Sequence, residues 1–113
     1  MKKIEAIIRP ARFESVRDAL ESAGYPGVTV TEVEGHGKQK GMVQQWRGQE
    51  YRVDLLPKLK LEIYCTSKEA SRIVKAILAG GTTGTVGDGK VFVSSVDGAY
   101  KIRNGESGDP VVS

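Results

Sequence analysis

The chain has 113 residues, the length of one ordinary domain, and its 39% hydrophobic content is enough for one modest core. Its 17 Lys and Arg against 14 Asp and Glu give a net charge of only +3, too mild for a sequence-independent nucleic-acid binder. It has no long apolar run for a membrane span, no signal-peptide pattern, and a single cysteine, Cys65, which allows neither an internal disulfide nor a thiolate metal site, so we expect a cytoplasmic protein.

The first half of the chain has the pattern of a strand, a helix and a second strand. Residues 3–9 alternate apolar and polar side chains, as half-buried strands do, and Pro10 ends this strand. A helical stripe follows, ended by Gly24 and made of Phe13, Val16, Ala19, Leu20 and Ala23. The β-branched segment 28–33 predicts the second strand.

The second half repeats this unit. Residues 59–65 alternate regularly and predict a strand, and Ser67 is the expected N-cap of a helix that ends at Gly80 and Gly81. The stripe of that helix is Ala70, Ile73, Val74, Ile77 and Leu78. Residues 91–96 predict a fourth strand, and 100–103 a short extra strand after a turn at 97–98. The order predicts an α+β fold, a ferredoxin-like βαββαβ sandwich with both helices on one face of an antiparallel sheet.

Two helices cover only one face of such a sheet. Strand alternation places Ile7, Val33 and Phe92 on the opposite face, where they should not be left in water. We therefore expect this face to be buried against further copies in a cyclic homo-oligomer. A monomer with a half-polar open sheet is the alternative.

A long connection, 37–55, separates the two halves. It holds three glycines and many polar residues without sustained periodicity, which predicts a functional loop without regular structure. Its large aromatic residues, Trp46 and Tyr51, are typical anchors at protein interfaces. The alternative is a long twisted hairpin whose aromatic side chains pack on its own base.

A glycine-rich segment precedes Lys90, with five glycines between residues 80 and 89. Residues 84–90 match the P-loop spacing G-x-x-x-x-G-K, but Val91 stands where a P-loop needs Ser or Thr. The order is also reversed, because this segment follows a helix and opens a strand. Its backbone N–H groups and the charge of Lys90 still suit phosphate binding, with a plain turn as the alternative.

A basic pair near the C-terminus adds to this prediction. If 100–103 is a strand, Lys101 and Arg103 lie on one side of it and join Lys90 as three cations, which suits a triphosphate. The alternative is a solvated basic edge. The single histidine, His36, has no nucleophile or carboxylate dyad placed with it, and no Cys/His spacing predicts a metal site.

Six stretches of the chain resemble the PII nitrogen-regulatory signal-transduction proteins: 29–33, 37–41, 47–51, 53–58, 83–93 and 102–106. The similarity covers essentially the whole chain, so 1–113 is expected to be one PII-type domain. Within it, 37–55 matches the regulatory loop, 82–90 the phosphate-binding loop and 101–106 a basic C-terminal loop.

The resemblance implies a homotrimer with ATP or ADP bound in the clefts between neighbouring subunits. The nucleotide-binding residues it implies are Thr29, Gly37, Lys38, Gln39, Glu62, Tyr64, Gly87, Asp88, Gly89, Lys90, Lys101 and Arg103. Of these, Lys101 and Arg103 reach in from the adjacent subunit, and Lys101 replaces the usual Arg, which removes a bidentate phosphate contact. With ATP and Mg²⁺ bound, 2-oxoglutarate is expected at Gln39, Lys40, Gly41 and Lys58, with Gln39 as the protein ligand of the metal.

The resemblance also implies a regulator and not an enzyme. Loop 37–55 would dock on an ammonium transporter, on nitrogen-metabolism enzymes or on a sensor kinase, and the transporter would recruit the protein to the membrane peripherally, without insertion. Tyr51 matches the tyrosine that is uridylylated in many bacterial members. One alternative is an adenine-nucleotide-binding enzyme with slow ATPase or transferase activity. An RNA-binding module of the same topology is disfavoured, because strand 59–65 offers only Tyr64 for base stacking.

Overall fold

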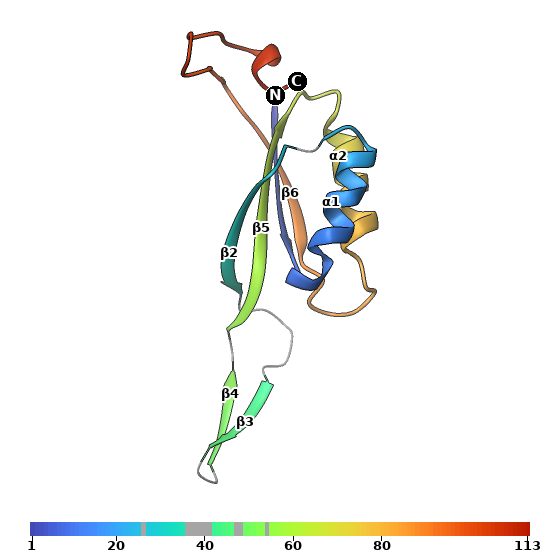
Figure 1. Cartoon of the computed structure of the whole chain (residues 1–113), viewed down its shortest axis with the longest axis vertical. Helices are drawn as coiled ribbons and strands as arrows, with labels where there is room; N and C mark the ends of the chain where they lie inside the picture. Colours follow the sequence, from blue (N-terminus) through green and yellow to red (C-terminus); the bar gives the residue numbers. More distant parts are fainter. Residues whose placement is uncertain (26, 36–41, 47–48, 54) are drawn as a thin grey trace.

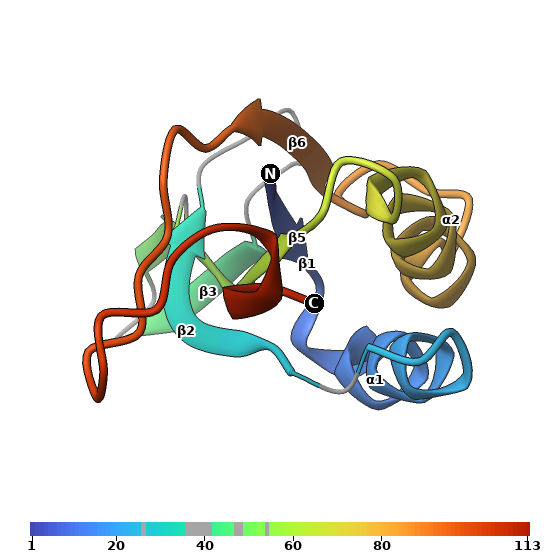
Figure 2. The same cartoon turned by 90° about the horizontal axis from the view of Figure 1, so that it is seen from above.

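Two helices and a four-stranded sheet form the body of the protein. The computed structural model describes residues 1–25, 27–35, 42–46, 49–53 and 55–113, and for 42–46 and 49–53 it describes the backbone alone. The strands lie in the order β2 (Thr29–Gly35), β5 (Leu56–Cys65), β1 (Lys2–Ile8) and β6 (Lys90–Ser95), and all neighbours are antiparallel. Both α1 (Phe13–Ser22) and α2 (Ala70–Gly81) cover the same face (Figures 1 and 2). This confirms the predicted α+β class and is compatible with a ferredoxin-like sandwich.

The core lies between this face and the helices, as the strand alternation predicts. The two central strands and both helices contribute the apolar residues of one side: Ile4, Ala6 and Ile8 from β1, Leu61, Ile63 and Cys65 from β5, Val16 and Leu20 from α1, and Ala70, Ile73 and Ile77 from α2. Leu78, the last residue of the predicted stripe, is instead 55% exposed and lines a small pocket together with residues of the turn that follows α2.

The helices end as the glycines predict, but the two glycines of α2 have an additional role. Gly24 adopts a φ of 88° beyond α1, and the N–H of Tyr25 returns to the carbonyl of Leu20 at 2.8 Å. Gly80 lies in the last turn of α2, where a Cβ atom would stand 2.7 Å from the Cα of Val16. The absence of a side chain at Gly80 therefore lets α2 approach the backbone of α1.

The predicted N-cap at Ser67 is wrong. α2 begins at Ala70, and Glu69 occupies the N-cap position without a side-chain capping bond. Residues 67–69 form a turn, and the Ser67 hydroxyl accepts a hydrogen bond from the N-terminal ammonium of Met1 at 3.2 Å. The hydroxyl is thus used to fix the start of β1 beside the end of β5.

The predicted strand at 100–103 is also wrong. Only Tyr100 is bridged, to Ser107, and the chain reverses between them: the N–H of Lys101 donates to the carbonyl of Glu106, and the N–H of Gly105 to that of Lys101. Asn104 and Gly105 explain the reversal, since Gly105 has a φ of 73° and the Asn104 side chain accepts a bond from the N–H of Glu106. Strand alternation therefore does not apply to Lys101 and Arg103.

Part of the long connection is a hairpin. β3 (Met42–Trp46) pairs antiparallel with β4 (Gln49–Val53), and Figure 1 shows both strands beyond the ends of β2 and β5. The prediction of a connection without regular structure is therefore wrong over these two segments. The packing of Trp46 and Tyr51, on which the hairpin alternative also depended, lies outside the described side chains.

The face opposite the helices carries both apolar and charged residues. The register places Ile7 opposite Lys60, Phe92 opposite Glu5 and Val33 opposite Lys58, so the three predicted apolar residues do share this face. Between them lies a network of charges: Lys3 is 3.2 Å from Glu62, and Lys60 is 3.8 Å from both Glu5 and Glu62. In the single chain this face is therefore half-polar, with Phe92 53% exposed.

Candidate functional site

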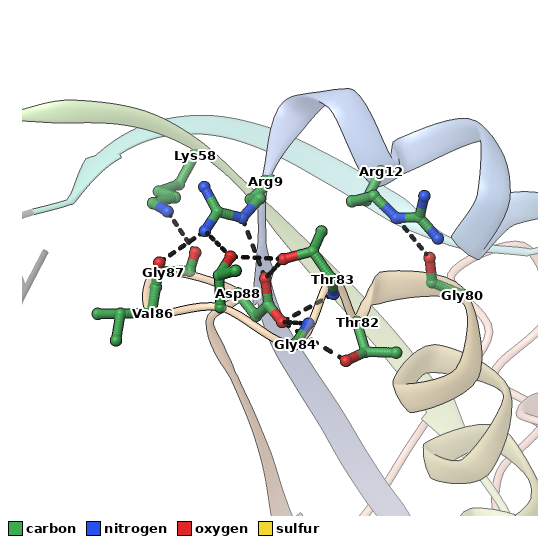
Figure 3. Close-up of polar contacts among 11 residues, drawn as sticks. Arg9, Arg12, Lys58, Gly80, Thr82, Thr83, Gly84, Val86, Gly87 and Asp88 are labelled. Carbon is green, nitrogen blue, oxygen red and sulfur yellow. Dashed lines mark hydrogen bonds and ion pairs between the residues drawn. The ribbon is translucent and has the colours of Figure 1, made fainter.

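The glycine-rich segment 82–89 forms a tight turn between α2 and β6, and the carboxylate of Asp88 organises it. This carboxylate accepts hydrogen bonds from the backbone N–H groups of Thr83 and Gly84, at 2.8 and 2.9 Å, and from the Thr83 hydroxyl (Figure 3). These bonds, those of Thr83 first, hold the pKa of Asp88 well below its usual range. Asp88 therefore stays ionised and its side chain points into the turn.

Two cations reach the same turn from the sheet. From the end of β1, Arg9 donates to the Asp88 carboxylate at 3.1 Å and to the carbonyl oxygen of Val86 at 2.6 Å. From β5, the ammonium of Lys58 donates to the carbonyl of Gly87 at 2.7 Å. Lys58 is only 9% exposed, and burial, followed by the nearby charge of Arg9, lowers its pKa. Both side chains point at the turn in Figure 3.

The turn is pressed against the end of β1 where β6 begins. A Cβ atom on Gly89 would stand 1.7 Å from the carbonyl oxygen of Ile7, and the φ of Gly89 is +97°, so glycine is required here. Lys90, the next residue, pairs with Ile7 and is exposed at the first position of β6. The predicted phosphate-binding residues Gly87, Asp88, Gly89 and Lys90 thus lie together, with Lys58 beside them.

A small pocket of about 120 Å³ adjoins the turn, lined in part by Leu78, Asp88, Gly89 and Lys90. Pockets that enclose an organic ligand are commonly ~300–1,000 Å³. A nucleotide would therefore need further walls beyond those that this pocket provides.

A second group of predicted residues lies on the open face of the sheet. Thr29 pairs with Glu62 across β2 and β5, and Tyr64 is two residues further along β5. Glu62 belongs to the charge network with Lys3 and Lys60, and the Lys3 ammonium lies 6.0 Å from the Tyr64 ring centre. The structure thus places Thr29, Glu62 and Tyr64 on one surface.

Within this chain the basic pair, Lys101 and Arg103, does not join Lys90, so the predicted group of three cations does not form here. Lys90 begins β6, whereas Lys101 and Arg103 follow its other end, and Figures 1 and 2 show that the C-terminal segment leaves β6 on the side opposite the helices. Lys101 forms an ion pair with Glu106 at 3.0 Å, and Arg103 is exposed in the turn.

Other predicted residues lie outside the described part of the chain. These are His36, Gly37, Lys38, Gln39, Lys40, Gly41 and the side chain of Tyr51. Among the described residues, no group of three or more His, Cys, Asp and Glu is placed to hold a metal ion. No helix of the described residues is both long and apolar enough to cross a bilayer.

Sequence reasoning missed Arg9, which bridges the turn, and the threonines that complete it. The only signal was position: a cation at the end of a predicted strand, just before the proline that stops it. The same reasoning placed Asp88 around the phosphates without assigning its side chain to the turn.

The family model "Nitrogen regulatory protein P-II" matches residues 1–106. The chain belongs to the P-II family. It is 50% identical over 112 residues to "Nitrogen regulatory protein P-II 2" of Methanothermobacter thermautotrophicus, covering 99% of this chain and 97% of that one. It is 51% identical to "Nitrogen regulatory protein P-II" of Rhizobium etli over 107 residues, covering 95% and 96% of the two chains. It is 48% identical to the P-II protein of Rhizobium meliloti over 108 residues, 96% of each. These P-II relatives are named as regulatory proteins.

Proposed function

We propose that this P-II family member is a nitrogen-regulatory signalling protein that binds ATP or ADP, and 2-oxoglutarate with Mg-ATP, at sites between the subunits of a homotrimer. The observation that carries the proposal is the turn 82–89: Asp88 folds it, and Lys90 and Lys58 stand beside it. Positive φ angles at Gly87 and Gly89 suit a loop whose backbone approaches an anion closely.

Two features support a site shared between subunits. The pocket beside the turn is too small to enclose a nucleotide, and Lys101 and Arg103 lie beyond the far end of β6 from Lys90. A neighbouring copy would bring its own basic C-terminal loop to this turn. The open face, with exposed Phe92 and Tyr64 around an ion-pair network, offers a surface that the packing of further copies would bury. On this arrangement, Thr29, Glu62 and Tyr64 surround the nucleoside.

Binding of Mg²⁺ would require bound ATP and 2-oxoglutarate together with one side chain of the protein. Asp88 is the carboxylate of the proposed phosphate-binding turn, and its oxygens already accept bonds from Thr83, Gly84 and Arg9, so it does not suit Mg²⁺. The amide oxygen of Gln39 is then the proposed protein ligand, a donor type that Mg²⁺ accepts. The bound metal would supply a positive centre that holds 2-oxoglutarate, while Lys40, Gly41 and Lys58 would bind the remainder of the acid.

The output would be the conformation of loop 37–55. Gln39 and Lys40 precede β3, so a ligand that binds them changes the equilibrium between loop conformations and hence between partners. The proposed partners are an ammonium transporter, nitrogen-metabolism enzymes or a sensor kinase, and Tyr51 is a proposed uridylylation site. The protein would act in the cytoplasm and reach the membrane through the transporter.

Calorimetry tests the central claim. We expect 2-oxoglutarate to bind only in the presence of Mg-ATP, and Gln39→Ala to abolish that binding while ATP still binds. Gln45→Ala, in β3, is the control and should leave both ligands unaffected. Binding of 2-oxoglutarate with equal affinity in the absence of nucleotide would overturn the coupled site, and ATP turnover that is lost in Lys90→Ala would favour the enzyme alternative.

A further inference from the structure

Arg9 connects the end of β1 to three points of the turn 82–89. Its Nε donates to Asp88 Oδ1 at 3.1 Å, and its Nη2 donates to the Thr85 hydroxyl at 3.1 Å and to the Val86 carbonyl at 2.6 Å (Figure 3). One rigid guanidinium therefore holds the middle and the end of the turn together. It also supports the carboxylate that binds the N–H groups of Thr83 and Gly84 at the start of the turn.

The bond to Val86 fixes the direction of a peptide N–H. The carbonyl of Val86 and the N–H of Gly87 belong to one planar trans unit and point in opposite directions. Because Arg9 binds the carbonyl, the N–H of Gly87 points away from the guanidinium. Lys58 acts in the same way on the next unit, since it binds the Gly87 carbonyl and so directs the N–H of Asp88 away from itself.

These two N–H groups are therefore oriented before any ligand arrives. Among the residues that the structure describes, no hydrogen bond takes up the N–H of Gly87 or of Asp88. Two neighbouring N–H groups directed to one side make a concave donor site for an anion. Preorganised donors of this kind bind better than donors that must first be ordered.

We propose that Arg9 is the positioning residue of the phosphate site: it holds the turn in its anion-binding form and acts through Val86 and Asp88. This inference rests on the proposed nucleotide function. It distinguishes Arg9 from Lys90, whose charge would attract phosphate directly. Arg12 supplies a matched control, because its guanidinium donates to the Gly80 carbonyl at 3.1 Å and to Ser15 at 3.2 Å, outside the turn.

Amide hydrogen exchange of the full chain without nucleotide tests the positioning step. In Arg9→Ala the Asp88 carboxylate loses the hydrogen bond from Arg9 that holds it in place. We therefore expect the N–H groups of Thr83 and Gly84, which donate to this carboxylate, to exchange about tenfold faster or more. Arg12→Ala should leave these two amides unchanged. Arg9→Lys keeps the charge but lacks the planar guanidinium that donates to several acceptors at once, so it should give an intermediate exchange rate. It serves as the second variant if Arg9→Ala does not fold. Unchanged exchange at Thr83 and Gly84 in both Arg9 variants would overturn the proposal.

ATP affinity, measured by calorimetry in the same variants, tests how Arg9 acts. We expect Arg9→Ala and Asp88→Asn each to weaken ATP about tenfold, and the double variant to be little weaker than either, because both disturb one turn. Additive losses would mean that Arg9 contacts the phosphates itself, and an equal loss in Arg12→Ala would mean a general structural effect; either result overturns the proposal. Failure of the unaltered chain to bind ATP would instead refute the proposed function, whereas the exchange rates test the hold of Arg9 on the turn separately.

Discussion

The ammonium of Lys58 lies 2.7 Å from the carbonyl oxygen of Gly87, so a largely buried cation on β5 is bonded directly to the turn that precedes β6. This contact links the residue proposed to bind 2-oxoglutarate with the loop proposed to bind phosphate. An anion that binds Lys58 and one that binds the turn therefore share a structural element. Linkage between two sites requires such a common element.

The lowered pKa of Lys58 gives a first prediction. Burial disfavours the charged form in the free protein, so stability rises as the pH increases through the folded pKa towards the unfolded value. A bound carboxylate would favour the charged form again. At alkaline pH, binding of 2-oxoglutarate with Mg-ATP should therefore be accompanied by proton uptake, measured by calorimetry in buffers of different ionisation enthalpy. Lys58→Ala should abolish this binding, and Lys75→Ala, on the exposed side of α2, should not. Binding without proton uptake would show that the carboxylate of 2-oxoglutarate does not pair with Lys58.

The ionised Asp88 predicts an acid-resistant turn. Its folded pKa lies below the unfolded value, so its stabilising effect is complete above that unfolded value and is lost only as the pH falls through the lower, folded one. The amide NMR signals of Thr83 and Gly84 should stay constant from neutral pH down through about pH 4, the ordinary range of Asp. They should shift only at lower pH. In Asp88→Asn both signals should be displaced already at neutral pH, and movement of the unaltered signals around pH 4 would contradict the assigned hydrogen bonds.

Two glycines of the same loop should respond differently to substitution. Gly89→Ala places a Cβ atom on the carbonyl oxygen of Ile7 and adds strain at positive φ, so we expect a loss of about 2 kcal/mol or more in unfolding free energy. Gly84 also has a positive φ, +83°, but nothing stands within 4 Å of its Cβ position, so Gly84→Ala should cost about 1 kcal/mol. Urea unfolding measures both. Equal losses of unfolding free energy in the two variants would show that the contact between a Cβ atom at residue 89 and the Ile7 carbonyl adds no cost.

Deletion of the hairpin should separate nucleotide binding from the binding of partner proteins. Deleting residues 42–52 removes β3 and most of β4, which pair with each other and not with the four-stranded sheet. We expect the oligomer and ATP binding to persist, by light scattering and calorimetry, and capture of partners from a host lysate to be lost. Capture by the full chain should differ between ATP with 2-oxoglutarate and ADP alone. Dissociation of the oligomer on deletion would show that the hairpin is structural.

The sequence by itself determined the layers of this protein. Period-two alternation in β1 and β5 and the apolar stripes of α1 and α2 specify which side of each element is buried, because burial depends on the repeat of the element and needs no knowledge of its neighbours. The motif around residues 83–93 likewise singled out, before its geometry was known, the turn to which we assign phosphate binding. Asn104 and Gly105 are typical turn residues and favoured the observed chain reversal, whereas the alternation of Lys101 and Arg103 had favoured a strand.

Only the tertiary structure decided the roles of Arg9, Gly80 and Ser67. Arg9 meets a turn 79 residues away in the chain, Gly80 meets α1, and Ser67 meets the N-terminus, contacts that no local pattern encodes. The same holds for Asp88, which the family resemblance placed among the nucleotide-binding residues, whereas the structure shows its carboxylate accepting the N–H groups of its own turn. Local periodicity fixes which side of an element faces inward, whereas hydrogen bonds between distant segments depend on how the whole chain packs.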